Sequence, residues 1–91
     1  MHKSYSIKTH KRVDKFFAAH PDIARKAISI FNELAKNPFD SSTNFDIAKY
    51  QGRLPNNYRL RIWWFRILYE INEEEIYIYL YDAGSRWKIY K

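Results

Sequence analysis

The chain has 91 residues, a hydrophobic content of 46% and a formal net charge of +6 at pH 7. This length predicts one small domain over residues 1–91, and the absence of cysteine excludes a disulfide framework, a thiolate metal site and a cysteine nucleophile. No apolar run is long enough to span a membrane and no apolar signal core is present, so we expect a cytoplasmic protein. The positive charge favours an anionic partner, such as nucleic acid, an acidic protein or a membrane surface.

The first 36 residues predict a short strand and two helices. The strand candidate is residues 4–8, SYSIK, and a helix follows from about Lys11 to Ala19. His20-Pro21-Asp22 stops that helix and starts another, because Pro suits a first helical turn and Asp favours the positive end of the helix dipole. The second helix ends near Lys36. Its apolar residues recur at helical spacing: Ile23, Ala27, Ile30, Phe31 and Leu34.

Residues 39–57 are rich in turn signals and are expected to form a loop, with partial helix or turn around residues 45–50. This segment carries apolar residues that can dock on the same core, so it requires no domain boundary. No internal repeat is present.

The last third of the chain contains three runs of β-branched and aromatic residues, from about residue 58 to 63, 66 to 71 and 75 to 81. In the first run Leu60 and Ile62 share one parity, and Arg59, Arg61 and Trp63 share the other. Because side chains alternate across a strand, we expect the two arginines to point together, away from the core.

In the third run Ile76, Ile78 and Leu80 form one face of a predicted strand, and three tyrosines at positions 77, 79 and 81 form the other. Asn72, Glu73 and Glu74 precede this run as a polar break of hairpin size. The tyrosine face is suited to packing, to contact with a partner, or to stacking on bases, because the ring is amphipathic.

These elements predict an α+β fold in the order β-α-α-β-β-β. The two helices form a hairpin whose apolar stripe must be buried, and the sheet is the one candidate of sufficient size. We therefore expect an antiparallel sheet of about four strands with the two-helix hairpin packed on one face.

Several kinds of catalytic site are not supported by the sequence. Its glycines are Gly52 and Gly84, which form no phosphate-binding loop, and His2, His10 and His20 lack the spacing of a metal site. We expect no metal ligand and no cofactor, and His20 is interpreted as a helix-junction residue. Serine nucleophile motifs are also absent.

What remains is fixed positive charge beside tyrosines. Arg59 and Arg61 are two apart on a predicted strand, a spacing suited to grasping a phosphate between two guanidinium groups. Arg66 opens the next strand, and Arg86 follows the third run. The alternative interpretation is a solvated basic surface that keeps a small domain soluble.

Five sequence features occur together in the second half of the chain: Gly52, Pro55-Asn56, Tyr58-Arg59-Leu60-Arg61-Ile62, Phe65-Arg66 and Gly84-Ser85-Arg86-Trp87-Lys88-Ile89-Tyr90. With the preceding helical hairpin, they resemble the RelE/ParE superfamily of toxins from type II toxin–antitoxin systems. In that family a loop with Gly and Pro-Asx precedes a strand of Tyr-basic-apolar-basic-apolar pattern. The following strand begins with Tyr-Arg or Phe-Arg, and the end often reads Gly-His-Arg-x-x-Val-Tyr.

The resemblance implies a RelE-like mRNA interferase, an endoribonuclease that inhibits translation by cutting messenger RNA in the ribosomal decoding site. In RelE-like members the ribose 2′-hydroxyl attacks the adjacent phosphate without a metal. Carried over by position, the catalytic residues are Arg59, Arg61, Arg66, Arg86 and Tyr90. The RNA-binding residues are Lys49, Lys88 and Trp63.

The general base is not identified by the resemblance. Arginine stays protonated, some relatives have lysine at the positions of Arg59 and Arg61, and Ser85 stands where many relatives have histidine. Three options remain open: Tyr90 as a phenolate, assistance from the ribosome, or orientation and electrostatics with little proton-transfer catalysis. We expect orientation and electrostatics to dominate.

The Trp63-Trp64-Phe65 run occupies a position where relatives often have a more polar turn. Three large aromatics there can pack over the hairpin end, contact an antitoxin or stack on an exposed base. Packing is the expectation, because aromatic side chains bury a large apolar area.

Two other functions fit the same sequence. A ParE-like inhibitor of DNA gyrase would share the fold, since fold does not determine function. A non-catalytic basic binding module is the other. For the toxin interpretation, the resemblance implies an acidic cognate antitoxin, a toxin–antitoxin hetero-oligomer, and the ribosome and mRNA as further partners, with no membrane.

Overall fold

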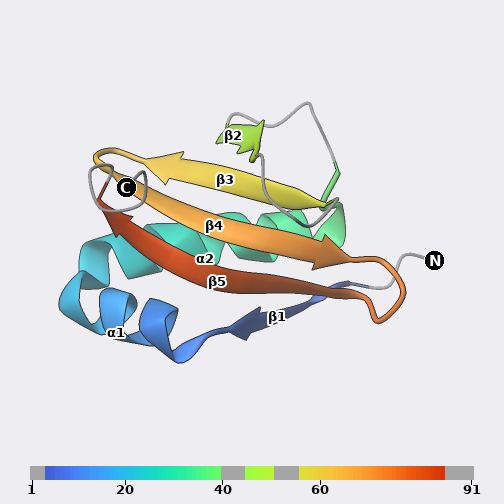
Figure 1. Ribbon diagram of the computed structural model, residues 1–91, viewed down its shortest axis with the longest axis horizontal. Coiled ribbons are helices and arrows are strands. Elements are labelled where there is room, and N and C mark those ends of the chain that lie inside the picture. Colours follow the sequence, from blue (N-terminus) through green and yellow to red (C-terminus); the bar gives the residue numbers. More distant parts are fainter. Residues whose placement is uncertain (1–3, 40–44, 51–55, 86–91) are drawn as a thin grey trace.

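The computed structural model describes residues 4–39, 45–50 and 56–85. Its elements are β1 (Ser6–Thr9), α1 (Lys11–Ala19), α2 (Pro21–Lys36), β2 (Asp46–Lys49), β3 (Asn57–Ile62), β4 (Phe65–Asn72) and β5 (Tyr77–Ser85). The α+β class is confirmed, with two helices packed on one side of a five-stranded sheet (Figure 1).

Both helices begin and end close to the predicted residues. His10 caps α1, its Nδ1 accepting a hydrogen bond from the Arg12 backbone N–H at 3.1 Å. Pro21 occupies the first turn of α2, where a missing N–H costs nothing. His20 joins the two helices, as predicted. The five apolar residues predicted for the stripe of α2 are all buried.

The sheet differs from the expected one in strand number and direction. Its order is β1-β5-β4-β3-β2, and β1 pairs with β5 in parallel, so the sheet is mixed. Parallel pairing requires a crossover between strands far apart in the sequence, which local patterns do not reveal. The three other neighbouring pairs are antiparallel, as expected.

The expectation of partial helix or turn at residues 45–50 is wrong, because Asp46–Lys49 forms the edge strand β2. Asp, Ala and Lys are poor strand formers, so local propensity gave little sign of this element. Pairing with β3 stabilises it, with Asp46 opposite Arg61 and Ala48 opposite Arg59.

The third predicted run is displaced towards the C-terminus. Strand β5 begins at Tyr77 and continues through Gly84 to Ser85. Ile76 lies before the strand in the turn, with φ 59°, a left-handed conformation that costs a β-branched residue energy. Ile78 and Leu80 are buried on the predicted face.

The core lies between the sheet and the helices. Phe31 of α2 meets Tyr69 of β4 edge-on, with ring centroids 4.9 Å apart, and Leu60 and Ile67 beside them are fully buried. In Figure 1 helix α2 runs behind β4, so the helices and the core occupy one face of the sheet. None of the helices that the structure describes is long and apolar enough to cross a membrane.

Candidate functional site

The sheet face opposite the core carries three of the predicted arginines, and we call it the arginine face. Residues directly opposite in antiparallel strands point to the same side, so one cross-strand row runs Asp46, Arg61, Arg66 and Gly84. The next row contains Ala48, Arg59, Leu68 and Asp82. The prediction that Arg59 and Arg61 share a face away from the apolar set of β3 is therefore confirmed.

Both arginines of β3 are joined to one carboxylate. Asp46 Oδ1 lies 3.5 Å from Arg59 Nη1, and Asp46 Oδ2 lies 3.5 Å from Arg61 Nε. The Arg59 side chain is 16% exposed and that of Arg61 is 45% exposed. Arg61 therefore keeps its terminal guanidinium nitrogens available, while Arg59 forms the floor of the site.

Arg66 adds a third guanidinium to the same face. It is buried, and its backbone lies directly opposite Arg61 on one side and Gly84 on the other. Like charges opposite one another in a sheet are unfavourable, and an anion placed between them removes that cost. Three arginines on two adjacent strands make this region suited to binding a phosphate.

A polar cluster adjoins the arginines where β5 is irregular. Leu68 faces Asp82 but Tyr69 faces Leu80, so Tyr81 is the extra residue of a β-bulge. Its hydroxyl donates a short hydrogen bond to Asn57 Oδ1 on β3. Burial raises the pKa of the Tyr81 hydroxyl, so this side chain stays protonated at neutral pH.

The remaining tyrosines of β5 make contacts within the protein. Lys8 Nζ lies 4.2 Å from the Tyr77 ring centroid, and Asn72 Nδ2 donates to the Tyr77 hydroxyl at 3.3 Å. Tyr79 lies against Tyr81 with ring centroids 6.4 Å apart. Of the three roles considered for these tyrosines, packing within the protein accounts for the contacts of Tyr77 and Tyr79.

Two predicted RNA-binding residues are placed away from the arginines. Lys49 stands opposite Tyr58, a residue that packs against the core, so its side chain leaves the sheet on the helix side. Trp63 follows the end of β3 with φ 53°, which breaks the strand alternation. Its ring lies 5.1 Å from Lys26 Nζ of α2, so Trp63 does not share the arginine face.

The aromatic turn is exposed. Trp63 is 59% exposed and Trp64 is 79% exposed, so the expectation that these rings pack over the hairpin end is wrong for Trp64. Phe65 does pack, with its ring 5.3 Å from that of Phe16 and 4.7 Å from that of His20. The other predicted site residues, Arg86, Lys88 and Tyr90, lie outside the described residues.

The described histidines have structural contacts. His10 caps α1, and His20 stacks on Phe16 with ring centroids 4.4 Å apart. In the described part of the chain, no group of three or more His, Asp or Glu side chains is arranged to hold a metal ion.

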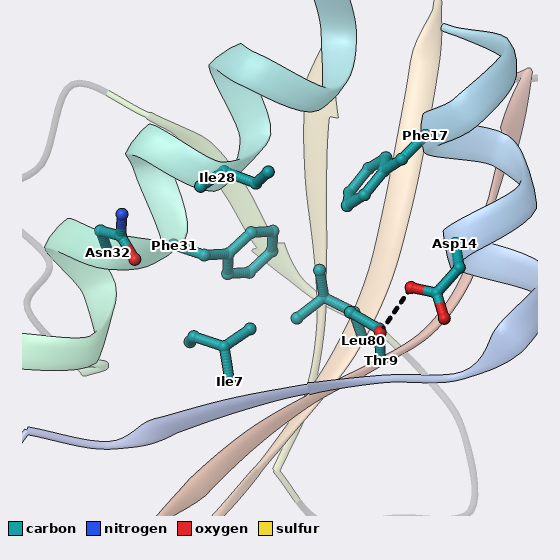
Figure 2. A pocket seen from close by; sticks show the side chains of 8 residues that line it. All are labelled: Ile7, Thr9, Asp14, Phe17, Ile28, Phe31, Asn32 and Leu80. Carbon is teal, nitrogen blue, oxygen red and sulfur yellow. Dashed lines mark hydrogen bonds between the residues drawn. The ribbon is translucent and has the colours of Figure 1, made fainter. Parts of the chain in front are cut away.

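A separate cavity of about 300 Å³ lies between β1 and the two helices (Figure 2). Its walls are mainly apolar, with Phe17, Ile28 and Phe31 pointing inward from the helices. Its charged lining residue, Asp14, accepts a hydrogen bond from Thr9 Oγ1 at 2.6 Å. The arrangement presents no cationic or nucleophilic group, so it does not resemble the arginine face in chemistry.

Sequence reasoning missed Asp46, Asn57 and Tyr81. Asp46 lay in a segment predicted to form partial helix or turn, and the available signal was that Asp46 stands between the apolar Phe45 and Ile47. Neither the bulge that turns Tyr81 nor its bond to Asn57 has a sequence signature, because they depend on the pairing of three strands.

No family model matches the sequence, and no curated protein matches it. Solved structures do. The archaeal RelE of the RelE–RelB complex from Pyrococcus horikoshii OT3 is 25% identical, with a TM-score of 0.76 over 92% of this chain and 97% of that one. A chain of the RelB–RelE antitoxin–toxin complex from Methanococcus jannaschii is 28% identical, with a TM-score of 0.67 over 91% and 94%. The isolated E. coli RelE toxin shares the fold at 14% identity, with a TM-score of 0.71 over 90% and 84%.

The fold and the basic sheet face thus define a small α+β protein of the RelE type. The resemblance found in the sequence is confirmed over about nine-tenths of the chain. In its fold and over most of its length, the chain is similar to RelE toxins.

Proposed function

We propose that this protein is the toxin of a toxin–antitoxin system and inhibits translation by cutting messenger RNA in the ribosomal decoding site. The observation that carries the proposal is the group of Arg59, Arg61 and Arg66 on one face of a RelE-type sheet. Guanidinium groups suit phosphate recognition because they donate several hydrogen bonds in a plane and keep their charge.

The proposed reaction is a transesterification. The 2′-hydroxyl attacks the adjacent phosphorus, negative charge builds on the non-bridging oxygens, and the 5′-oxygen leaves. Donors fixed in advance stabilise that charge more in the transition state than in the bound message. Arg61 supplies such donors at the surface of the site, with Arg59 and the buried Arg66 adding positive charge beneath it.

Two further residues are assigned from the family resemblance alone. Arg86 matches the arginine of the C-terminal Gly-x-Arg motif and is proposed to bind the same phosphate. Tyr90 matches the terminal tyrosine and is proposed to orient the substrate. Lys49, Lys88 and Trp63 are proposed as contacts to message or ribosomal RNA outside the arginine face. No step of this reaction requires a cofactor.

An antitoxin is proposed as the resting partner in the cytoplasm. Two of the matching structures contain RelE together with RelB. This chain has a net charge of +6, which favours an acidic partner. A helix or an extended tail of that partner laid over the arginine face would neutralise it and block access of RNA.

The test is primer extension on a defined message in programmed ribosomes, with purified protein and a chelator present. A cut in the decoding site that survives chelation and is lost in Arg86→Ala supports the proposal. Relaxed plasmid DNA after induction, with intact message, supports a ParE-like action on gyrase instead. Ribosome binding without a cut supports the non-catalytic module.

A further inference from the structure

We propose that Asp46 is the general base of this toxin, taking the proton from the attacking 2′-hydroxyl. The inference rests on the proposed ribonuclease function and adds a catalytic residue to it. It assigns a carboxylate on the edge strand β2 that the sequence did not suggest as a site residue.

The position of Asp46 meets the geometric requirement for such a base. The 2′-oxygen and the 3′-oxygen of one ribose are on adjacent carbons, so the attacking hydroxyl lies beside the phosphate. The proton acceptor must therefore lie beside the cations that hold that phosphate. Asp46 is 3.5 Å from Arg59 Nη1 and 3.5 Å from Arg61 Nε, and it stands in the same cross-strand row as Arg61 and Arg66.

The Asp46 carboxylate is only partly covered by its two arginine contacts. A closed fork-to-fork pair with arginine brings nitrogen and oxygen to about 2.7–2.9 Å and occupies both carboxylate oxygens. Both contacts here are longer, and the Asp46 side chain is 54% exposed. A ribose hydroxyl can therefore approach the exposed part of the carboxylate, while Arg61 keeps its terminal nitrogens for phosphate.

Three other described groups fit this role less well. Ser85 stands opposite Phe65, whose ring packs on α1, so it points to the helix side of the sheet. Burial raises the pKa of the Tyr81 hydroxyl, which opposes formation of a phenolate. Asp82 is in the row of Arg59 but two strands away, and its carboxylate faces Arg12 of α1 at 3.9 Å.

The step balances without an added reactant. As the 2′-oxygen bonds to phosphorus, its proton passes to an Asp46 carboxylate oxygen and the bond from phosphorus to the 5′-oxygen breaks. The leaving oxygen takes a proton from water, and Asp46 returns its own proton to water afterwards. The products are a 2′,3′-cyclic phosphate and a 5′-hydroxyl end.

The experiment separates chemistry from binding in programmed ribosomes. Single-turnover cleavage is measured for wild type, Asp46→Asn and Asp46→Glu, and binding is measured with a message carrying a 2′-deoxy nucleotide at the cut site. We expect Asp46→Asn to slow cleavage by about 100-fold or more, as for loss of a general base. Binding should be unchanged or tighter, because a negative charge is removed near a polyanion. Asp46→Glu should retain more rate than Asp46→Asn, because it keeps a carboxylate.

The matched control is Asp22→Asn, which removes the same charge from an exposed carboxylate paired with Arg25 on α2. It should cut at the wild-type rate. If wild type cleaves and Asp46→Asn cleaves equally fast, Asp46 is not the general base. The proposed ribonuclease function is then unaffected. Loss of binding in proportion to cleavage overturns the assignment of the base as well, because Asp46 then only holds the arginines. No cleavage by wild type overturns the proposed function itself.

Discussion

The arginines of β3 and β4 differ in how far their side chains are buried. This determines which arginine can be substituted without disturbing the fold. Arg66 is buried beneath the site, and Arg59 is largely covered, with its Nη1 beside Asp46. The Arg61 side chain is 45% exposed, so its removal leaves the core untouched. Arg61 is therefore the residue whose loss reports on chemistry more than on folding.

We expect Arg61→Ala to lower the cleavage rate by about 10²–10³-fold, the effect of removing one preorganised donor to transition-state charge. Its melting temperature should stay close to that of wild type. Single-turnover cleavage and a thermal melt measure the two effects. Arg25→Ala, an exposed arginine of α2, is the matched control. Unchanged cleavage by Arg61→Ala would remove this residue from the mechanism.

Ionisation of the Tyr69 hydroxyl should make the free energy of unfolding depend on pH. Burial raises the pKa of its hydroxyl above the ordinary value of 10.0, with a further contribution from Tyr58 beside it. Below pH 10.0 the hydroxyl is protonated in both states and the stability is fully present. As the pH rises further, the unfolded chain releases the proton first, so the free energy of unfolding falls.

Tyr69→Phe should therefore show a shallower loss of unfolding free energy than wild type between neutral pH and about pH 11. Denaturant melts at a series of pH values measure the slope. Tyr79→Phe, on a half-buried tyrosine at the arginine face, is the matched substitution. Equal slopes for wild type and Tyr69→Phe would contradict the assignment to this group.

Among the elements, those with strong local periodicity were predicted and those that depend on pairing were not. The stripe of α2 recurs at helical spacing, so the helix and its buried face followed from the sequence. Strand β2 has Ile47 as its one strong strand former and depends on its pairing with β3. Strand β1 pairs with β5, which lies at the other end of the described chain. The alternation of Arg59 and Arg61 with Leu60 was readable, whereas the carboxylate that joins them came from the unpredicted strand.

The turn between β3 and β4 provides a test at the level of a single element. Trp64 is 79% exposed, so Trp64→Ala should change the free energy of unfolding by only about 0.5 kcal/mol, as for other surface substitutions. A packed aromatic would cost about 3–5 kcal/mol. Denaturant unfolding distinguishes these values, and Phe31→Ala, in the core, marks the upper end. A cost near that of Phe31→Ala would show that the ring is buried.

For the whole molecule, the net charge of +6 and the basic sheet face favour a bound acidic partner. A ligand that binds the folded state alone stabilises it by about 2.7 kcal/mol at one hundred times its Kd. We therefore expect the cognate antitoxin, added at saturating concentration, to raise the melting temperature. High salt should reduce the gain, because exposed charges are screened. A melting temperature unchanged by a candidate antitoxin would exclude that protein as the partner.

The activity proposed for the arginine face is to promote attack by a ribose hydroxyl on its neighbouring phosphate. The most direct measurement compares an all-ribose message with one carrying a single 2′-deoxy nucleotide at the cut site, in programmed ribosomes with chelator present. We expect cleavage of the first to a 2′,3′-cyclic phosphate and a 5′-hydroxyl end, and no cleavage of the second. Cleavage of the deoxy message at the same site, or a 5′-phosphate end, would contradict this expectation.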